Sequence, residues 1–189
     1  MTTFRTTEKS RFNPHYLLFL LVPVVVAGCG PTFLTMTYSP SSMVSATGSV
    51  SISEFKYLPA ERGTVGPNQI KNTAIGSIVL SQSISGYFKD ATFKEFRLIG
   101  IKVNDKDRLL TGEIFSFSID DLGMSVDWEL TVRYMLKNAQ TNEVLYDSIK
   151  AIKRHTEKAP LTFNNNLNEV IRENIEALLH DDAFIKKIN

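Results

Sequence analysis

The sequence has few of the residues that build catalytic, metal-binding or cross-linked proteins. It contains one cysteine and three histidines among 189 residues, so no disulfide bond can form within the chain. It shows no H-x-x-x-H or H-E-x-x-H spacing, no G-x-S-x-G elbow and no phosphate-binding loop. We therefore expect no metal, no cofactor and no enzymatic activity.

Excess charge and long hydrophobic runs are also lacking. Lys and Arg number 21 against 20 Asp and Glu, and the small basic excess lies in the first eleven residues, so nucleic-acid binding is not indicated. The longest apolar run, residues 16–26, is far shorter than the ~20 residues that a membrane-spanning helix needs. Its length, and the preceding Arg5, Lys9 and Arg11, are typical of a secretory signal peptide.

The single cysteine follows this run directly. The segment V-A-G-C, Val26 to Cys29, resembles the lipobox of bacterial lipoproteins. The resemblance implies cleavage between Gly28 and Cys29 and attachment of lipid to the sulfur and the new amine of Cys29. Several acyl chains anchor a protein stably, whereas one chain does so only marginally. A buried, unmodified cysteine is the alternative.

The residue after the cysteine bears on the destination of such a lipoprotein. In Gram-negative lipoproteins an Asp at this position favours retention at the inner membrane, and here it is Gly30. The resemblance thus implies an outer-membrane lipid anchor, palmitate included, with the protein facing the periplasm. In another type of host the anchor would lie in the cell membrane.

Three regions follow from these patterns. Residues 1–28 are predicted to be the lipoprotein signal peptide, and residues 29–48 the lipidated cysteine with a flexible tether rich in Ser, Thr, Pro and Gly. A flexible chain of that size spans ~20–25 Å. Residues 49–189 are predicted to form one periplasmic domain.

The domain is predicted to have an α+β fold, an antiparallel sheet of about four strands covered on one face by two helices. Helical spacing predicts a helix from Ser83 to Leu98 with Gly100 at its end, and a second helix capped by Asn164–Asn166. A last short turn would be capped by Asp181 or Asp182. Alternating or apolar segments predict strands at residues 50–58, 109–120, 125–136 and 144–153, with a bulge at Gly112. Residues 59–76 are predicted to be a loop. Residues 77–80 either extend this loop or form a short strand after it.

Several single residues invite a functional interpretation, and each has a simpler one. We expect His155 and His180 to be solvated, and Trp128 to lie in the core rather than to stack on a ligand. Asp120-Asp121 and Asp181-Asp182 are expected to bond locally at turns rather than to serve as catalytic carboxylates or calcium ligands. An aromatic group is expected to be mostly core, with part of it available for a partner-binding groove: Phe88, Phe93, Phe96, Phe115 and Phe117.

The order of motifs resembles the YajG family of bacterial lipoproteins. It comprises the lipobox, SISGYFKDATFKEFR at residues 83–97, LLTGEIFSF at 109–117, DDLG, WELTVRY at 128–134 and the closing AFIKKI. The resemblance covers roughly residues 50–189 and implies an α+β periplasmic domain without known enzymatic activity. Related-looking groups are the auxiliary lipoproteins of ABC-type lipid transporters and the lipoproteins that activate penicillin-binding proteins.

The leading hypothesis is a non-enzymatic, membrane-anchored lipoprotein whose periplasmic domain binds another cell-envelope component, an envelope protein and not nucleic acid. The alternative is an auxiliary lipoprotein for lipid or lipopolysaccharide transport, in which sheet and helix enclose an apolar groove. A hydrolase using Asp120 and Asp121 is a third hypothesis.

Overall fold

The computed structural model describes residues 34–159 and 162–189. The predicted signal peptide, Gly28 and Cys29 therefore lie outside the described residues. None of the helices in the described ranges is long and apolar enough to cross a membrane.

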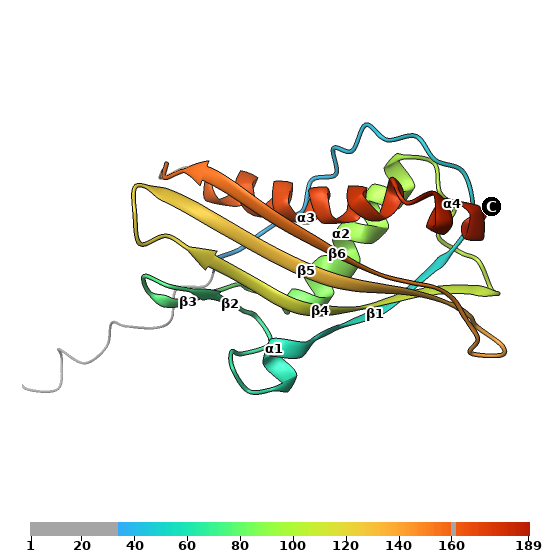
Figure 1. Ribbon diagram of the computed structural model, residues 1–189, viewed down its shortest axis with the longest axis horizontal. Coiled ribbons are helices and arrows are strands. Elements are labelled where there is room, and N and C mark those ends of the chain that lie inside the picture. The colour runs from blue at the N-terminus through green and yellow to red at the C-terminus, as the bar shows by residue number, and fades with distance from the viewer. Residues whose placement is uncertain (1–33, 160–161) are drawn as a thin grey trace, which may run out of the picture. The chain divides into compact units, whose positions relative to one another are not determined.

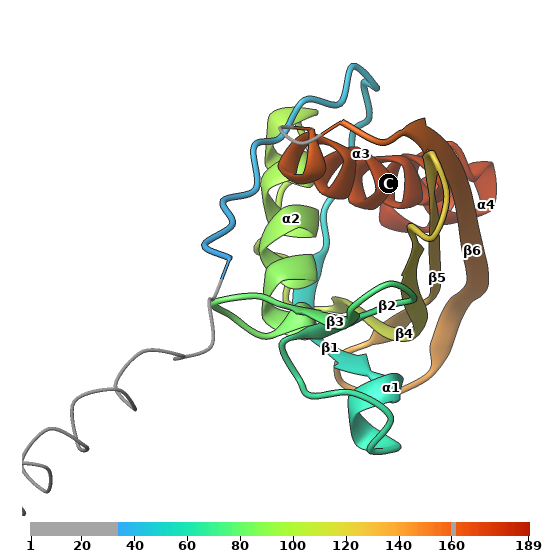
Figure 2. The ribbon, with the colours of Figure 1, turned by 90° about the vertical axis from the view of Figure 1, so that its left-hand side faces the viewer.

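The described residues form one compact unit, in which the long helices cover one face of a sheet (Figures 1 and 2). Its elements are β1 (Ser51–Tyr57), α1 (Leu58–Glu61), β2 (Gln69–Asn72), β3 (Gly76–Val79), α2 (Ile84–Leu98), β4 (Arg108–Asp120), β5 (Ser125–Asn138), β6 (Val144–Glu157), α3 (Phe163–Leu179) and α4 (Asp182–Ile188).

The predicted α+β class is correct, but the sheet is larger and of a different kind than predicted. It has six strands in the order β3-β2-β4-β5-β6, and β1 also pairs with β4. Strands β4, β5 and β6 are antiparallel, whereas β1 and β2 run parallel to β4 along the same edge. Because β1 and β4 pair in parallel, the chain must cross over between them. The segment that connects them contains α2.

The additional elements are short. Strands β2 and β3 have four residues each, as does α1. Four residues contain too few periods to be recognised in a Gly- and Pro-rich segment, so the expected loop at residues 59–76 holds a strand and a helix. The other option, a short strand near residues 77–80, is confirmed as β3.

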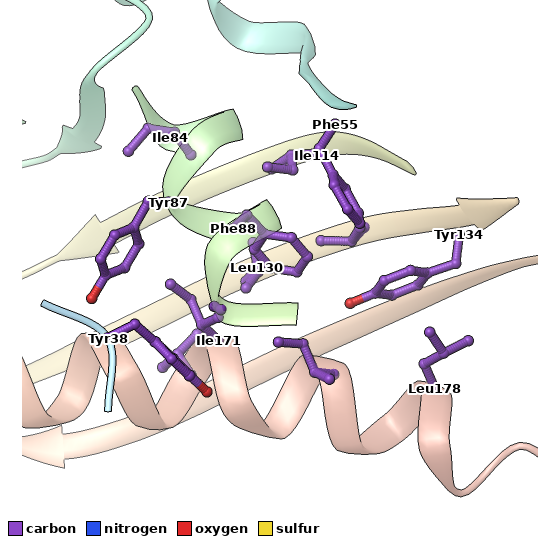
Figure 3. Packing of buried hydrophobic residues seen from close by; sticks show 14 of the residues in the cluster. Tyr38, Phe55, Ile84, Tyr87, Phe88, Ile114, Leu130, Tyr134, Ile171 and Leu178 are labelled. Atoms are coloured by element: carbon purple, nitrogen blue, oxygen red, sulfur yellow. The ribbon is translucent and has the colours of Figure 1, made fainter. Parts of the chain in front are cut away.

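The core lies between the sheet and helices α2 and α3. On β5, the alternation predicted from the sequence is confirmed, because its inward side chains are buried: Trp128, Leu130, Val132, Tyr134 and Leu136. Figure 3 shows Tyr134 and Leu130 facing Phe88 of α2 and Ile171 of α3. These side chains fill the space between the two layers.

Gly112 allows an aromatic ring of β1 to approach the sheet closely. A Cβ atom at Gly112 would lie 2.3 Å from the ring of Phe55. That ring packs against Phe88 and Tyr134, with centroid distances of 5.1 and 6.1 Å. The bulge predicted at Gly112 is displaced, since the β4–β5 register shifts between Ile114 and Ser116.

The helix ends match the sequence signals in three of four cases. Ser83 caps α2 by accepting a hydrogen bond from the Gly86 amide, and Gly100 after the helix has a φ of 99°. Asp181 caps α4 in the same way, through the Ala183 amide. The prediction for Asn164–Asn166 is wrong, because α3 begins at Phe163 and the asparagines lie in its first turn.

The described part of the predicted tether is docked on the domain. We call residues 34–48 the strap; Figure 2 shows it in blue, passing outside α2 and the start of α3. Leu34 forms a parallel bridge with Leu80, and Met36 and Tyr38 are buried in the core. Ser and Thr dominate the composition of this segment, but its few large apolar side chains give it enough buried surface to pack.

A buried carboxylate holds the strap. Glu95 of α2 is fully buried and accepts hydrogen bonds from the Tyr38 hydroxyl, at 2.6 Å, and from the amides of Ser41 and Ser42, both at 3.1 Å. Burial raises the pKa of Tyr38, and the hydrogen bond to Glu95 is the next largest cause of this rise. All three donors belong to the strap, so its docking supplies the partners that a buried charge requires.

The other end of the strap is joined to the C-terminus. The Ser49 amide donates to the Ile188 carbonyl at 2.8 Å, and Arg108 donates to the same oxygen at 2.7 Å. A Cβ atom at Gly48, whose φ is 130°, would lie 2.6 Å from that oxygen. Only glycine suits this position, because it needs both a left-handed φ and close contact with backbone.

A second charged contact joins α4 to β6. Asp181 accepts hydrogen bonds from the Lys150 ammonium and the Tyr146 hydroxyl, each at 2.7 Å. The hydrogen bonds from Lys150 and Tyr146 lower the pKa of Asp181 to about 2. Charged side chains thus bring the last helix onto the strand at the edge of the sheet.

Substitution of Glu95 tests the attachment of the strap. Glu95→Gln would place an amide N–H beside the backbone N–H groups that now share the carboxylate. We expect a loss of about 2 kcal/mol in the free energy of unfolding and faster proteolysis within residues 34–48. Glu61→Gln, at an exposed position, is the control and should change neither. Equal proteolysis of the Glu95→Gln variant and the parent would contradict the assignment.

Acid titration tests the Asp181 contact. Because its pKa is lower in the folded than in the unfolded chain, the contact stabilises the fold above pH ~4, by about 2 kcal/mol, and this contribution is lost as the pH falls toward 2. Asp181→Asn keeps a capping side chain but removes the charge. In chemical denaturation, the variant should be less stable than the parent at pH 6, and the difference should vanish near pH 2. A difference independent of pH would refute the ionic contribution.

Candidate binding groove

The face of the sheet away from α2 and α3, here called the outer face, carries a groove. Its volume is about 750 Å³. Ser116, Ser118 and Glu129 point away from the core on β4 and β5 and line it. Pro59 of α1 and Val65 of the following loop form another wall. The groove therefore combines residues that are far apart in the sequence.

The bulge in β4 gives the groove its aromatic side chain. Because one extra residue is inserted between Ile114 and Ser116, both Phe115 and Ser116 line the groove. Phe115 is half-buried, whereas Phe88, Phe96 and Phe117 of the predicted aromatic group are core residues. Phe93 is the remaining member; it is partly exposed beneath Arg97, whose guanidinium lies 5.6 Å from the ring centroid.

Opposite charges are paired across the strands that carry the groove. Lys153 of β6 bonds Glu129 of β5, and this hydrogen bond raises the pKa of Lys153. His155 lies 2.7 Å from Asp127 in the neighbouring cross-strand position. His155 is exposed, as predicted. The two pairs place positive and negative side chains side by side, so the groove carries no strong charge of one sign.

The carboxylates at the end of β4 have structural partners, but the local bonding predicted for both is found only for Asp120, with the Leu122 amide. Their other partners lie in the β2–β3 turn, 47 residues away in the sequence. Asp120 accepts hydrogen bonds from the Thr73 hydroxyl at 2.7 Å and the Leu122 amide at 3.3 Å, and these bonds, in that order, lower its pKa. Asp121 accepts from the Ala74 amide at 3.2 Å. A carboxylate whose pKa is lowered is a weak general base near neutral pH, so the geometry offers no support for the hydrolase hypothesis.

The remaining residues of interest have structural surroundings. Trp128 is buried; its indole donates to the Thr156 hydroxyl at 3.1 Å and packs on Phe163 at 5.2 Å. His180 follows the last residue of α3, at the end of the helix that favours a cation. Within residues 34–159 and 162–189, no three His, Cys, Asp or Glu side chains are placed to hold a metal ion.

Two buried polar groups escaped the sequence analysis. Asn174 of α3 accepts a hydrogen bond from the Tyr134 hydroxyl at 2.8 Å and donates to the Lys150 carbonyl at 3.0 Å. Glu95 holds the strap. Both occupy positions on the apolar stripe of their helices, which is the one signal that could have identified them.

Comparison with known proteins adds a fold but no family. No family model and no curated protein matches the chain. The crystal structure of protein XCC0632 from Xanthomonas campestris, of the family DUF330, matches with a TM-score of 0.64 and 10% identity, over 82% of this chain and 97% of that one. At this identity the match shows a shared fold.

Two further structures match more weakly. The protein CT253 of Chlamydia trachomatis has a TM-score of 0.45 at 9% identity, covering 70% of this chain and 95% of that one. A minor lipoprotein of Acinetobacter baumannii has a TM-score of 0.40 at 10% identity, covering 72% and 92%. Neither similarity is close enough to carry an argument, and none of the comparisons points to YajG in particular.

Proposed function

We propose that the protein is a non-enzymatic bacterial lipoprotein, anchored through Cys29, whose domain binds another protein of the cell envelope. The observation that carries the proposal is V-A-G-C at residues 26–29, directly after an apolar run and a basic N-terminal segment. Among the side chains, only a thiol can form the thioether that holds the lipid. A YajG-like identity and an outer-membrane location facing the periplasm are parts of the same proposal.

The groove on the outer face is the proposed contact surface. It offers an exposed part of Phe115, the hydroxyls of Ser116 and Ser118, and paired charges at Glu129 and Lys153. Interfaces between proteins are commonly of this mixed character, with an aromatic anchor and a polar rim. A partner that inserts a side chain or loop beside Phe115 would fit such a groove.

The alternative of a lipid carrier finds less support in the fold. It places an apolar groove between the sheet and the helices. In the described part of the chain that space is occupied by large side chains, among them Phe88, Trp128 and Tyr134, each no more than 1% exposed. A bound acyl chain would have to displace such side chains, which are closely packed.

Labelling with palmitate tests the anchor. The parent should incorporate label and float with membranes, and a Cys29→Ser variant should do neither, because the hydroxyl cannot form the thioether. Equal incorporation in the two proteins would refute lipidation at Cys29.

A variant that fills the groove tests the contact surface. Ser118→Arg adds a long side chain on the outer face without touching the core, and Ile149→Arg adds the same side chain at an exposed position of β6 outside the groove. In cross-linked envelopes, we expect partners recovered with the parent to be retained by Ile149→Arg and reduced at least tenfold by Ser118→Arg, about 1.4 kcal/mol of binding. Equal recovery with both variants would exclude the groove, and no partner above background with the parent would refute the binding function.

A further inference from the structure

Two neighbouring turns carry exposed apolar side chains at one end of the sheet. Three of the four most exposed large hydrophobic side chains among the described residues lie here. Their exposed fractions are 92% for Met124, 72% for Leu122 and 71% for Ile75. Ile75 lies in the β2–β3 turn, and the other two lie in the β4–β5 turn. Isolated exposed hydrophobic residues are ordinary, but a group of them at one place indicates an interaction surface.

Hydrogen bonds hold these two turns together. The Thr73 hydroxyl donates to Asp120 at 2.7 Å and accepts from the Asp121 amide at 3.1 Å, and the Ala74 amide donates to the Asp121 carboxylate at 3.2 Å. Lys158 donates to the Asp121 carbonyl at 2.6 Å. The three apolar side chains therefore project from one cross-linked platform, which we call the turn platform (residues 73–75 and 121–124).

The strap begins on the strand that leads out of the Ile75 turn. At Leu34 the backbone pairs in parallel with Leu80, so it runs in the direction of β3, which leads away from the Ile75 turn. The N-terminal side of the Leu34 backbone is therefore directed toward the turn platform, as the start of the strap in Figure 1 also indicates. The Leu34 amide donates to Val79 and the Leu34 carbonyl accepts from Ser81, both at 3.0 Å, which fixes the entry point.

The proposed lipid anchor is close to this entry point. Cys29 and Leu34 are five residues apart, and five residues span at most ~18 Å in any conformation. Ile75 and Leu80 are also five residues apart, along β3, about 17 Å in an extended strand. The reach of the anchor therefore matches the distance from the entry point to the platform.

We infer that the turn platform rests on the bilayer that holds the lipid anchor, with Ile75, Leu122 and Met124 entering the interfacial region. This inference rests on the proposed lipidation of Cys29. The carboxylates of Asp120 and Asp121 lie beside these side chains and would not be drawn to anionic lipids, so the contact depends on apolar burial and needs no negatively charged headgroups.

Site-specific fluorescent labelling of the lipidated full-length protein tests the inference. Acylated Cys29 has no free thiol, so a cysteine introduced as Ile75→Cys, Leu122→Cys or Met124→Cys is the sole labelling site. Val144→Cys is the control, because Val144 is also exposed and apolar but lies at the far end of the ~45 Å long β5–β6 hairpin. An environment-sensitive dye is attached, and the proteins are reconstituted in phosphatidylcholine vesicles.

Dyes at positions 75, 122 and 124 should show blue-shifted emission, quenching by lipids with a nitroxide near the headgroup, and protection from iodide. The dye at 144 should behave as in water. If the vesicles float but the dyes at all four positions remain exposed to water, the inference is overturned and the proposed anchor still holds. Protection that depends on protein density rather than on lipid quencher would overturn it in favour of contact between copies. Failure of the parent to float, or labelling of Cys29, would instead refute the proposed lipidation.

Discussion

The position of this domain relative to its proposed anchor depends on one buried carboxylate. Glu95 is fully enclosed, and the strap supplies its hydrogen-bond donors from Tyr38, Ser41 and Ser42. Without the strap the charge would lack these partners in the protein interior, which is strongly unfavourable. The strap and α2 therefore stabilise each other, and Cys29 is five residues in the sequence from Leu34, where the strap begins, instead of being separated from the domain by a tether of 20 residues.

Much of the fold could be predicted from periodicity and end signals. The long antiparallel strands and α2 repeat their patterns often enough to be recognised, and Ser83, Gly100 and Asp181 mark ends that the structure confirms. The short strands and the parallel pairing of β1 could not be predicted, because four residues hold little pattern and pairing is decided by distant residues. The polar composition of the strap predicts a free chain, whereas its docking depends on Met36, Tyr38 and one distant glutamate, Glu95.

The candidate site was less accessible to prediction. The groove is formed by α1, β2, β4, β5 and β6 together, and the sequence pattern specifies only that Ser116, Ser118 and Glu129 face away from the core. Part of the aromatic group was expected to be available to a partner, but the exposure of Phe115 in particular comes from a bulge three residues beyond Gly112. By contrast, Asp120, Asp121 and Trp128 have structural surroundings, as expected, although their partners Thr73, Ala74 and Thr156 are distant in the sequence.

Together, the docked strap, the V-A-G-C segment and the apolar turns support our proposal of a domain held directly against a membrane, with its groove available to a partner. Neutron reflectometry of the lipidated protein on a supported bilayer tests this central claim most directly. We expect protein density to begin at the headgroup layer, with no intervening water. A hydrated gap of ~20 Å, the span of a free tether, would contradict it.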